Sequence, residues 1–183
     1  DDTALVFRSK NTDDIENRLC EEMESLSIWL EENKLSLHLG KTESILFASN
    51  QRLKKTSELD ISCNGIKVKA KEFVKYLGVT LDQTKSGKIM GTTILQKINA
   101  KVKFLYRKGI FFGIKEKKML CSALVQSSFD YASNCWDRGL PKCLQVKFQS
   151  AQNRIVRYVL NYHNRQHLSF TDFKKLNWLD VPT

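Results

Sequence analysis

Two adjacent carboxylates, Asp1 and Asp2, stand directly before a short apolar run of β-prone residues, 4–7. Placing them there costs free energy, because like charges repel each other and Asp is a poor strand former. A bound divalent cation offsets this cost. Mg²⁺ takes carboxylate and phosphate oxygens as ligands, and two such ions stabilise the attacking and leaving oxygens of a phosphoryl transfer. An ordinary polar loop also accounts for the pair, so its meaning depends on the motifs that follow.

Several short motifs follow the two carboxylates in a collinear series. They are Trp29-Leu30-Glu31-Glu32-Asn33-Lys34-Leu35, Gly40-Lys41-Thr42-Glu43, Tyr76-Leu77-Gly78-Val79, Asp130-Tyr131-Ala132 with Trp136, and Gln149-Ser150-Ala151-Gln152-Asn153-Arg154. Together with Asp1-Asp2-Thr3, the series resembles the reverse transcriptase of non-LTR (LINE-type, jockey-like) retrotransposons over nearly the whole chain. One departure is His38, because members of this family usually have Asn at that point.

The resemblance implies RNA-directed DNA polymerisation, in which a primer 3′-OH attacks the α-phosphate of a deoxynucleotide with the help of two Mg²⁺ ions. It implies that Asp1 and Asp2 are catalytic metal ligands and that Lys41 protonates the leaving group. It also implies that Tyr76, Leu77 and Gly78 position the primer. The expected partners are an RNA template, a DNA primer and deoxynucleoside triphosphates. The family needs a further Asp upstream of Asp1, and fingers, so we expect this polypeptide alone not to polymerise.

Taken without the family, Lys41 and Gly78 have simpler explanations. Lys41 follows a glycine and is therefore a mobile cation suited to a triphosphate, but a solvated surface lysine has the same sequence context. Gly78 lies inside a β-prone run, where glycine often marks the close approach of a ligand, or a bulge in an ordinary sheet. Both alternatives stay open at this point.

Basic residues are concentrated in the later part of the chain. Residues 1–60 contain 8 Lys and Arg against 13 Asp and Glu, whereas residues 61–183 contain 22 against 7. A large basic excess with interspersed aromatic residues is typical of a nucleic-acid-binding protein, although a solvated lysine-rich surface is the simpler alternative. The residues that we expect to bind nucleic acid are Lys97, Lys101, Arg107, Lys108, Arg154 and Arg157.

A second function also fits this composition. The chain is then a non-enzymatic, basic nucleic-acid-binding module derived from a retrotransposon, whose binding is sensitive to salt and independent of Asp1 and Asp2. A third alternative is a decaying copy of the element that has no function, against which the intact reading frame and regular helical patterns argue.

The cysteines and the hydropathy indicate an intracellular protein, nuclear or cytoplasmic by the resemblance. The five cysteines are odd in number and include no C-x-x-C pair, which favours reduced thiols. The sequence has no apolar run of about 18 residues and no signal-peptide pattern, so we expect no membrane partner. His163 and His167 have zinc-finger spacing, but no cysteine pair accompanies them, so we expect surface residues rather than a zinc site.

The elements that must position these residues suggest an α+β fold. We expect part of a reverse transcriptase palm over residues 1–87, with antiparallel strands and one flanking helix, and a mostly α-helical thumb with the start of a following segment over 88–183. The composition places the boundary at residues 85–91, where Ser86, Gly87 and Gly91 lie close together.

In the first part we expect an opening strand at residues 1–7, a helix over 12–33, and strands at 35–39 and 44–48. A polar loop over 49–60, a hairpin over 61–68 that turns at Asn64-Gly65, and a strand over 73–82 follow. In the second part we expect helices beyond Gly91, from Lys115 to about Trp136 and from Pro141 to 159, and a short last helix that opens at Ser169 with a capping box. The residues predicted to face inward from the second of these helices are Met119, Leu120, Ala123, Leu124 and Ser127.

Overall fold

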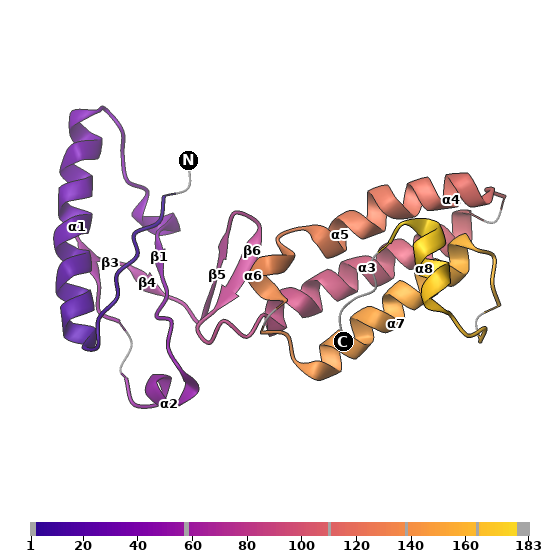
Figure 1. Ribbon diagram of the computed structural model, residues 1–183. Coiled ribbons are helices and arrows are strands. Elements are labelled where there is room, and N and C mark those ends of the chain that lie inside the picture. Colours follow the sequence, from indigo (N-terminus) through magenta and orange to yellow (C-terminus); the bar gives the residue numbers. More distant parts are fainter. Residues whose placement is uncertain (1–2, 57–58, 110, 138, 164, 179–183) are drawn as a thin grey trace. The chain divides into compact units, whose positions relative to one another are not determined.

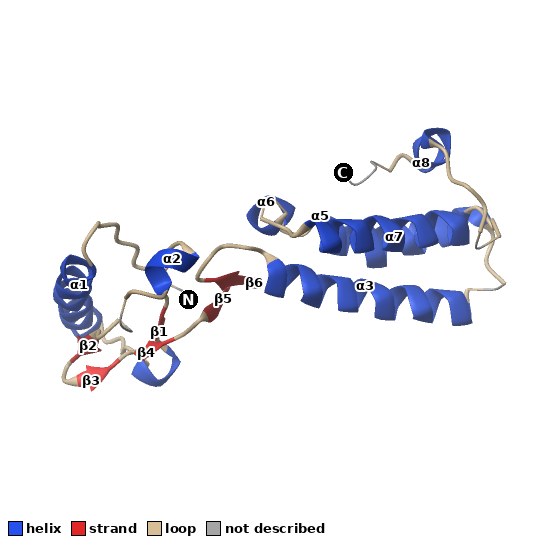
Figure 2. Ribbon diagram, turned by 90° about the horizontal axis from the view of Figure 1, so that it is seen from below, coloured by secondary structure: helices blue, strands red, loops and turns tan. Residues whose placement is uncertain are grey.

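The chain forms two compact units. The computed structural model describes residues 3–56, 59–109, 111–137, 139–163 and 165–178. Contacts divide the chain after Lys85 into an N-terminal unit, residues 1–85, and a helical unit, residues 86–183 (Figures 1 and 2). Each unit buries its own apolar residues, and the chain as a whole mixes helices with small sheets.

One long helix, α1 (Thr12–Glu32), covers the core of the N-terminal unit and confirms the helix that was predicted here. Its first turn is capped by Asn11, whose side-chain oxygen accepts a hydrogen bond from the Asp13 N–H. Met23 is buried on its inner face, and Ile15 and Leu19 pack against the same cluster. The rest of this small core is formed by Leu59, Ile61, Cys63 and Val68.

Three strands that were predicted for this unit differ from the structure. Residues 3–9 and 35–38 form no strand, and a 3₁₀ turn over Leu39–Lys41 follows instead. An alternating sequence makes a strand only where a second strand pairs with its backbone, and none does so here. Of the run 44–48, only Ser44 belongs to a strand, β1 (Glu43–Ser44).

β1 pairs in parallel with β4 (Lys69–Ala70), so the expectation of purely antiparallel strands is wrong for this pair. The polar stretch predicted as a loop contains a short helix, α2 (Asn50–Leu53).

Two hairpins complete the N-terminal unit. β2 (Ser62–Cys63) and β3 (Ile66–Lys67) confirm the first, which turns at Asn64 and Gly65 with φ angles of 52° and 75°. The second consists of β5 (Phe73–Tyr76) and β6 (Val79–Asp82). The sequence predicted one strand here, but Leu77 and Gly78 have φ angles of 46° and 80° and reverse the chain. Gly78 is therefore a turn residue rather than a glycine inside a strand.

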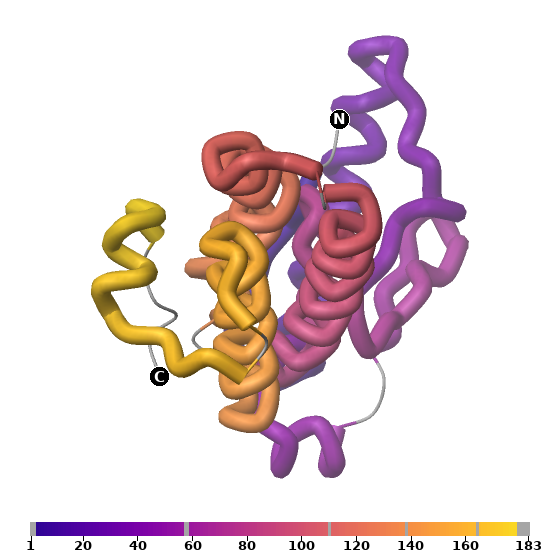
Figure 3. The backbone as a smooth tube through the Cα atoms, turned by 90° about the vertical axis from the view of Figure 1, so that its right-hand side faces the viewer, coloured from indigo at the N-terminus to yellow at the C-terminus, as the bar shows by residue number. Residues whose placement is uncertain are grey.

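The helical unit contains three long helical segments around one core. Figure 3 looks along them and places α3, α4 and α7 side by side. The element bounds are α3 (Lys88–Lys108), α4 (Ile114–Cys121), a π-helical segment (Ser122–Gln126), α5 (Ser127–Asp130), α6 (Ser133–Trp136), α7 (Lys142–Val159) and α8 (Phe170–Leu176).

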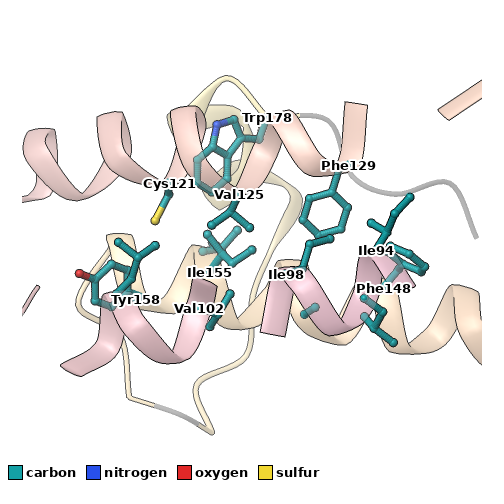
Figure 4. Packing of buried hydrophobic residues seen from close by; sticks show 14 of the residues in the cluster. Ile94, Ile98, Val102, Cys121, Val125, Phe129, Phe148, Ile155, Tyr158 and Trp178 are labelled. Carbon is teal, nitrogen blue, oxygen red and sulfur yellow. The ribbon is translucent and has the colours of Figure 1, made fainter. Parts of the chain in front are cut away.

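The core of the helical unit lies between these segments (Figure 4). α7 buries the inner face that its periodicity predicted: Leu144, Phe148, Ala151, Ile155, Val156 and Val159. α3 begins before Gly91, which therefore lies inside the helix. A Cβ at this position would collide with the Leu140 side chain, so glycine lets α3 pack closely there. Trp136 stacks on Phe148 with ring centroids 5.3 Å apart, which closes one end of the core.

Of the residues predicted to face inward from the second helical segment, only Leu120 packs against the core, and the others are exposed. Met119 is 66% exposed and Leu124 is 39% exposed, whereas the buried positions are four residues apart: Lys117, Cys121, Val125 and Phe129. Four residues exceed one α-helical turn of 3.6 residues, so such a stripe drifts around a regular helix. The wider π-helical turn over Ser122–Gln126 compensates for this drift and keeps the stripe on the core.

The last helix, α8, confirms the predicted capping box. Asp172 accepts hydrogen bonds from the N–H and the hydroxyl of Ser169, each 3.0 Å long. The carboxylate also accepts hydrogen bonds from Tyr162 and Lys175. None of the helices among the described residues is both long and apolar enough to span a membrane.

Candidate nucleic-acid interface

Helices α3 and α7 run side by side, and hydrogen bonds connect their exposed edges. Arg154 of α7 donates a hydrogen bond to the Asn99 side chain of α3. The Tyr106 hydroxyl donates to the Arg154 carbonyl oxygen at 3.0 Å, and its ring lies 4.9 Å from that of Tyr158. These contacts hold Arg154 against α3.

An open groove of about 410 Å³ follows this edge and is called the basic groove below. Four cations and one phenol line it, over a base formed by the buried Val102. The four cations and the phenol are Lys103, Tyr106 and Arg107 from α3, and Arg154 and Arg157 from α7.

The positive charge of the basic groove is not neutralised by the described residues, because none of their carboxylates forms an ion pair with its four cations. The guanidinium groups instead bind neutral oxygens. Arg157 Nε donates to the Gln166 carbonyl oxygen at 2.9 Å, and Arg154 donates to Asn99. Such contacts orient a guanidinium group and leave its charge and further N–H groups available to a phosphate.

The Tyr106 hydroxyl stays protonated over the whole neutral range. Burial raises its pKa, and the neighbouring Arg154 and Arg157 partly oppose this shift. The groove therefore presents a neutral phenol between cations, with an aromatic face and a hydroxyl already committed to Arg154.

The structure brings three of the six predicted nucleic-acid-binding residues together on the basic groove: Arg107, Arg154 and Arg157. Lys97 and Lys108 are exposed on α3 but do not line the groove. The sequence analysis missed Lys103 and Tyr106. Lys103 precedes Arg107 by four residues and so lies on the same face of the helix, a signal that would have found it.

Lys101 has partners inside the unit. Its ammonium group donates to the Leu124 carbonyl oxygen and to the Ser128 hydroxyl, both at 2.7 Å. Leu124 belongs to the π-helical segment, and its carbonyl oxygen also accepts a longer hydrogen bond, of 3.4 Å, from the Ser128 hydroxyl. The side chain that was predicted to bind nucleic acid therefore ties α3 to this segment.

No match to known proteins accompanies this geometry. Comparisons of the chain with protein-family models, curated proteins and solved structures found nothing similar. The resemblance to retrotransposon reverse transcriptases therefore depends on the motifs in the sequence.

The residues that the resemblance relates to polymerisation lie in the N-terminal unit. Asp1 and Asp2 are outside the described residues. Lys41 is exposed and ends the 3₁₀ turn Leu39–Lys41, with its N–H bonded to the His38 carbonyl oxygen at 2.9 Å. Tyr76, Leu77 and Gly78 form the exposed end of the β5–β6 hairpin.

In the part of the chain that the structure describes, no three His, Cys, Asp or Glu side chains gather into a metal-binding group. Along the sequence, the first carboxylates after Asp1 and Asp2 are in the first turn of α1, where Asp14 accepts a hydrogen bond from Ser9. Among the cysteines, Cys121 is fully buried, and burial raises its pKa to about 12, which disfavours the thiolate that a metal requires.

Proposed function

We propose that the helical unit binds nucleic acid by its phosphate groups along the basic groove, as part of a reverse transcriptase of the non-LTR type. The observation that carries the proposal is the group of four cations on one edge, which the described carboxylates leave unneutralised. The composition of the unit supports it, because residues 86–183 contain 17 Lys and Arg against 5 Asp and Glu, a net charge of +12.

Each side chain of the groove has a role in this proposal. Arg107, Arg154 and Arg157 bind phosphate oxygens through paired N–H groups, and Lys103 adds a mobile point charge. Cations that replace the counterions of a nucleic acid release them into solution, which makes the affinity depend steeply on salt. Contacts of this kind position a nucleic acid without selecting its sequence.

The groove is tested with a matched pair of double variants in the full chain. R107Q/R154Q removes two charges from the groove, and K142Q/K147Q removes two exposed charges from the first half of α7. Fluorescence anisotropy with an RNA–DNA duplex, from about 50 to 200 mM salt, gives the affinity and its salt slope. We expect R107Q/R154Q to lower the slope by about 2, since each phosphate contact contributes about 0.9.

The control variant K142Q/K147Q should change the affinity much less than R107Q/R154Q. Equal losses in the two variants would contradict the groove and indicate diffuse attraction by the whole surface. Circular dichroism shows whether either variant has lost helix.

The proposal that this chain is part of a polymerase depends on the N-terminal unit. The collinear motifs support it, and so do the exposure of Lys41 on its turn and of the β5–β6 turn, both of which leave room for a substrate. A primer with a photoreactive thymidine at its 3′ end tests it, because the proposal expects cross-links to the peptide that contains Tyr76 and Leu77. Cross-links confined to residues 86–183 would contradict primer positioning by this hairpin.

A non-enzymatic binding module is the second candidate, and it is favoured by the location of the whole groove in a unit with its own core. It predicts that Asp1→Asn and Asp2→Asn leave both binding and the cross-linking pattern unchanged. The enzyme predicts that the reading frame upstream of Asp1 encodes a further Asp on an apolar strand. Sequencing the transcript in this frame distinguishes the two candidates.

A further inference from the structure

The connection between α3 and α4 exposes large apolar side chains. Phe111 is 95% exposed, and Phe112 and Ile114 are 42% and 49% exposed. Phe111 and Phe112 are called the aromatic tip below. Folded proteins rarely leave neighbouring aromatic rings in water unless these contact a partner, so the tip is a candidate binding surface.

The base of the tip is held in place on the end of α7. Gly109 is buried, and the Tyr158 hydroxyl occupies the space into which a Cβ at this position would project. The Phe112 N–H donates to the Gly109 carbonyl oxygen at 3.3 Å and closes a turn. On the other side, the buried Lys117 donates to the Asn161 side chain and lies 5.0 Å from the Tyr158 ring centre. Both ends of the connection are therefore fixed, which lowers the entropy lost on binding.

Cations flank the tip in the sequence. Arg107 and Lys108 precede it, and Lys115 and Lys118 follow it. Glu116 is the only carboxylate in the sequence from residue 101 to 129. Arg107 also lines the basic groove and precedes Phe111 by four residues, so one cation belongs both to the groove and to the chain next to the tip.

We propose that the aromatic tip stacks on unpaired bases of a single-stranded RNA or DNA segment whose phosphates lie along the basic groove. The inference depends on the proposed function and names the form of nucleic acid that it takes. A cationic groove for the backbone next to exposed aromatic rings for the bases is the combination by which proteins bind single strands. Phenylalanine has no polar group to read a base edge, so the contact tolerates any sequence.

The test uses the full chain and fluorescence anisotropy with three labelled probes. They are a thymidine strand of about 12 nucleotides, an abasic strand of equal length and charge, and an RNA–DNA duplex. The variants are F111A, F111L, which keeps an apolar side chain, and F111W, which keeps an aromatic ring. V146A is the matched control, since Val146 is 67% exposed on α7.

We expect F111A and F111L to weaken binding of the thymidine strand about tenfold, because stacking on one base contributes about that factor. F111W and V146A should bind like the unchanged chain. None of the variants should affect the abasic strand or the duplex, which have no unpaired base to offer.

Three results would overturn the inference. One is an F111L variant that binds the thymidine strand as tightly as the unchanged chain, and another is an equal loss for the abasic strand. The third is an F111A variant that binds all oligonucleotides like the unchanged chain but has lost binding to phosphatidylserine vesicles. That result would assign the tip to a membrane surface. R107Q/R154Q weakens the thymidine and abasic strands alike if the groove binds phosphates, so failure of the groove and failure of the tip are distinguishable.

Discussion

The hydroxyl group of Tyr158 is buried, and none of the described residues forms a hydrogen bond with it. Burial also raises the pKa of this phenol. A buried hydroxyl without a partner loses its hydrogen bonds to water and gains none, which costs about 1–3 kcal/mol. The Tyr106 hydroxyl, by contrast, donates to the Arg154 carbonyl oxygen. The two neighbouring tyrosines therefore contribute differently to stability.

We predict opposite effects for the two tyrosine-to-phenylalanine variants. Y158F removes the unpaired hydroxyl and should leave the free energy of unfolding unchanged or raise it by about 1 kcal/mol. Y106F removes a hydrogen bond and should lower it by about 1 kcal/mol. Urea denaturation followed by circular dichroism measures both. A clear loss of stability in Y158F would mean that the hydroxyl has a partner.

Asp172 should make the stability of the helical unit depend on pH. The Ser169 N–H, together with the Ser169 hydroxyl, Lys175 and Tyr162, lowers the pKa of this carboxyl from 3.8 to about 2. Because the folded pKa lies below the unfolded one, the stabilisation is complete above about pH 4 and is lost as the pH falls to about 2. We predict that D172N is less stable than the unchanged chain at neutral pH.

The stability difference between D172N and the unchanged chain should shrink through this window, as measured by urea denaturation at several pH values. E22Q, a change of an exposed carboxylate on α1, is the control and should keep the pH dependence of the unchanged chain. A constant difference between D172N and the unchanged chain from pH 6 to about 2 would contradict the role of Asp172.

At the scale of elements, the link between α3 and the π-helical segment depends on Lys101. K101M keeps the length of the side chain but removes the donors to the Leu124 carbonyl oxygen and the Ser128 hydroxyl. We predict a loss of about 1 kcal/mol in the free energy of unfolding, because a carbonyl oxygen then lacks its charged donor. K97M, one turn earlier and exposed, should change it by less than about 0.5 kcal/mol. Equal stabilities of the two variants would remove this role from Lys101.

The helices were easier to predict than the strands, for a physical reason. A helix closes its hydrogen bonds within its own sequence, so periodicity was sufficient for α1 and for the inner face of α7. A strand needs a partner, and residues 35–38, whose leucines alternate correctly, have none among the described residues. Leu120 was predicted correctly to face the core from the second helical segment, but the other predicted residues were not, because the prediction assumed a regular α-helix and the π-helical turn changes the inner face.

In the candidate site, too, some residues could be predicted from the sequence and others could not. Arg107, Arg154 and Arg157 were predicted because charge on a helix face is visible in the sequence. Lys101 looked equivalent to them, but its partner is a backbone oxygen 23 residues away, which no side-chain pattern reveals. The aromatic tip was not predicted, since only the exposure of Phe111 distinguishes it from a core residue.

At the scale of the whole molecule, the two units differ in the size of their cores. Of the described residues, 21 form the buried cluster of the helical unit, and five form that of the N-terminal unit. We predict that urea unfolds the N-terminal unit first, because it buries less apolar surface. Trp29 reports on this unit, whereas Trp136 and Trp178 report on the other.

Comparing W29F with the unchanged chain separates these signals. The fluorescence transition at lower urea should vanish in W29F, and the later transition should remain. A single transition at one urea concentration for all reporters would mean that the units unfold together.

The π-helical segment also limits how the gene can vary. A π turn contains one residue more than an α turn, so deleting one residue from 122–126 would restore a regular α-helix. The residues after the deletion would then rotate relative to α3, and the contacts of Lys101 with Leu124 and Ser128 would be lost. Related genes that are one codon shorter in the segment should therefore tolerate other residues at position 101, and related genes of full length should keep a lysine there.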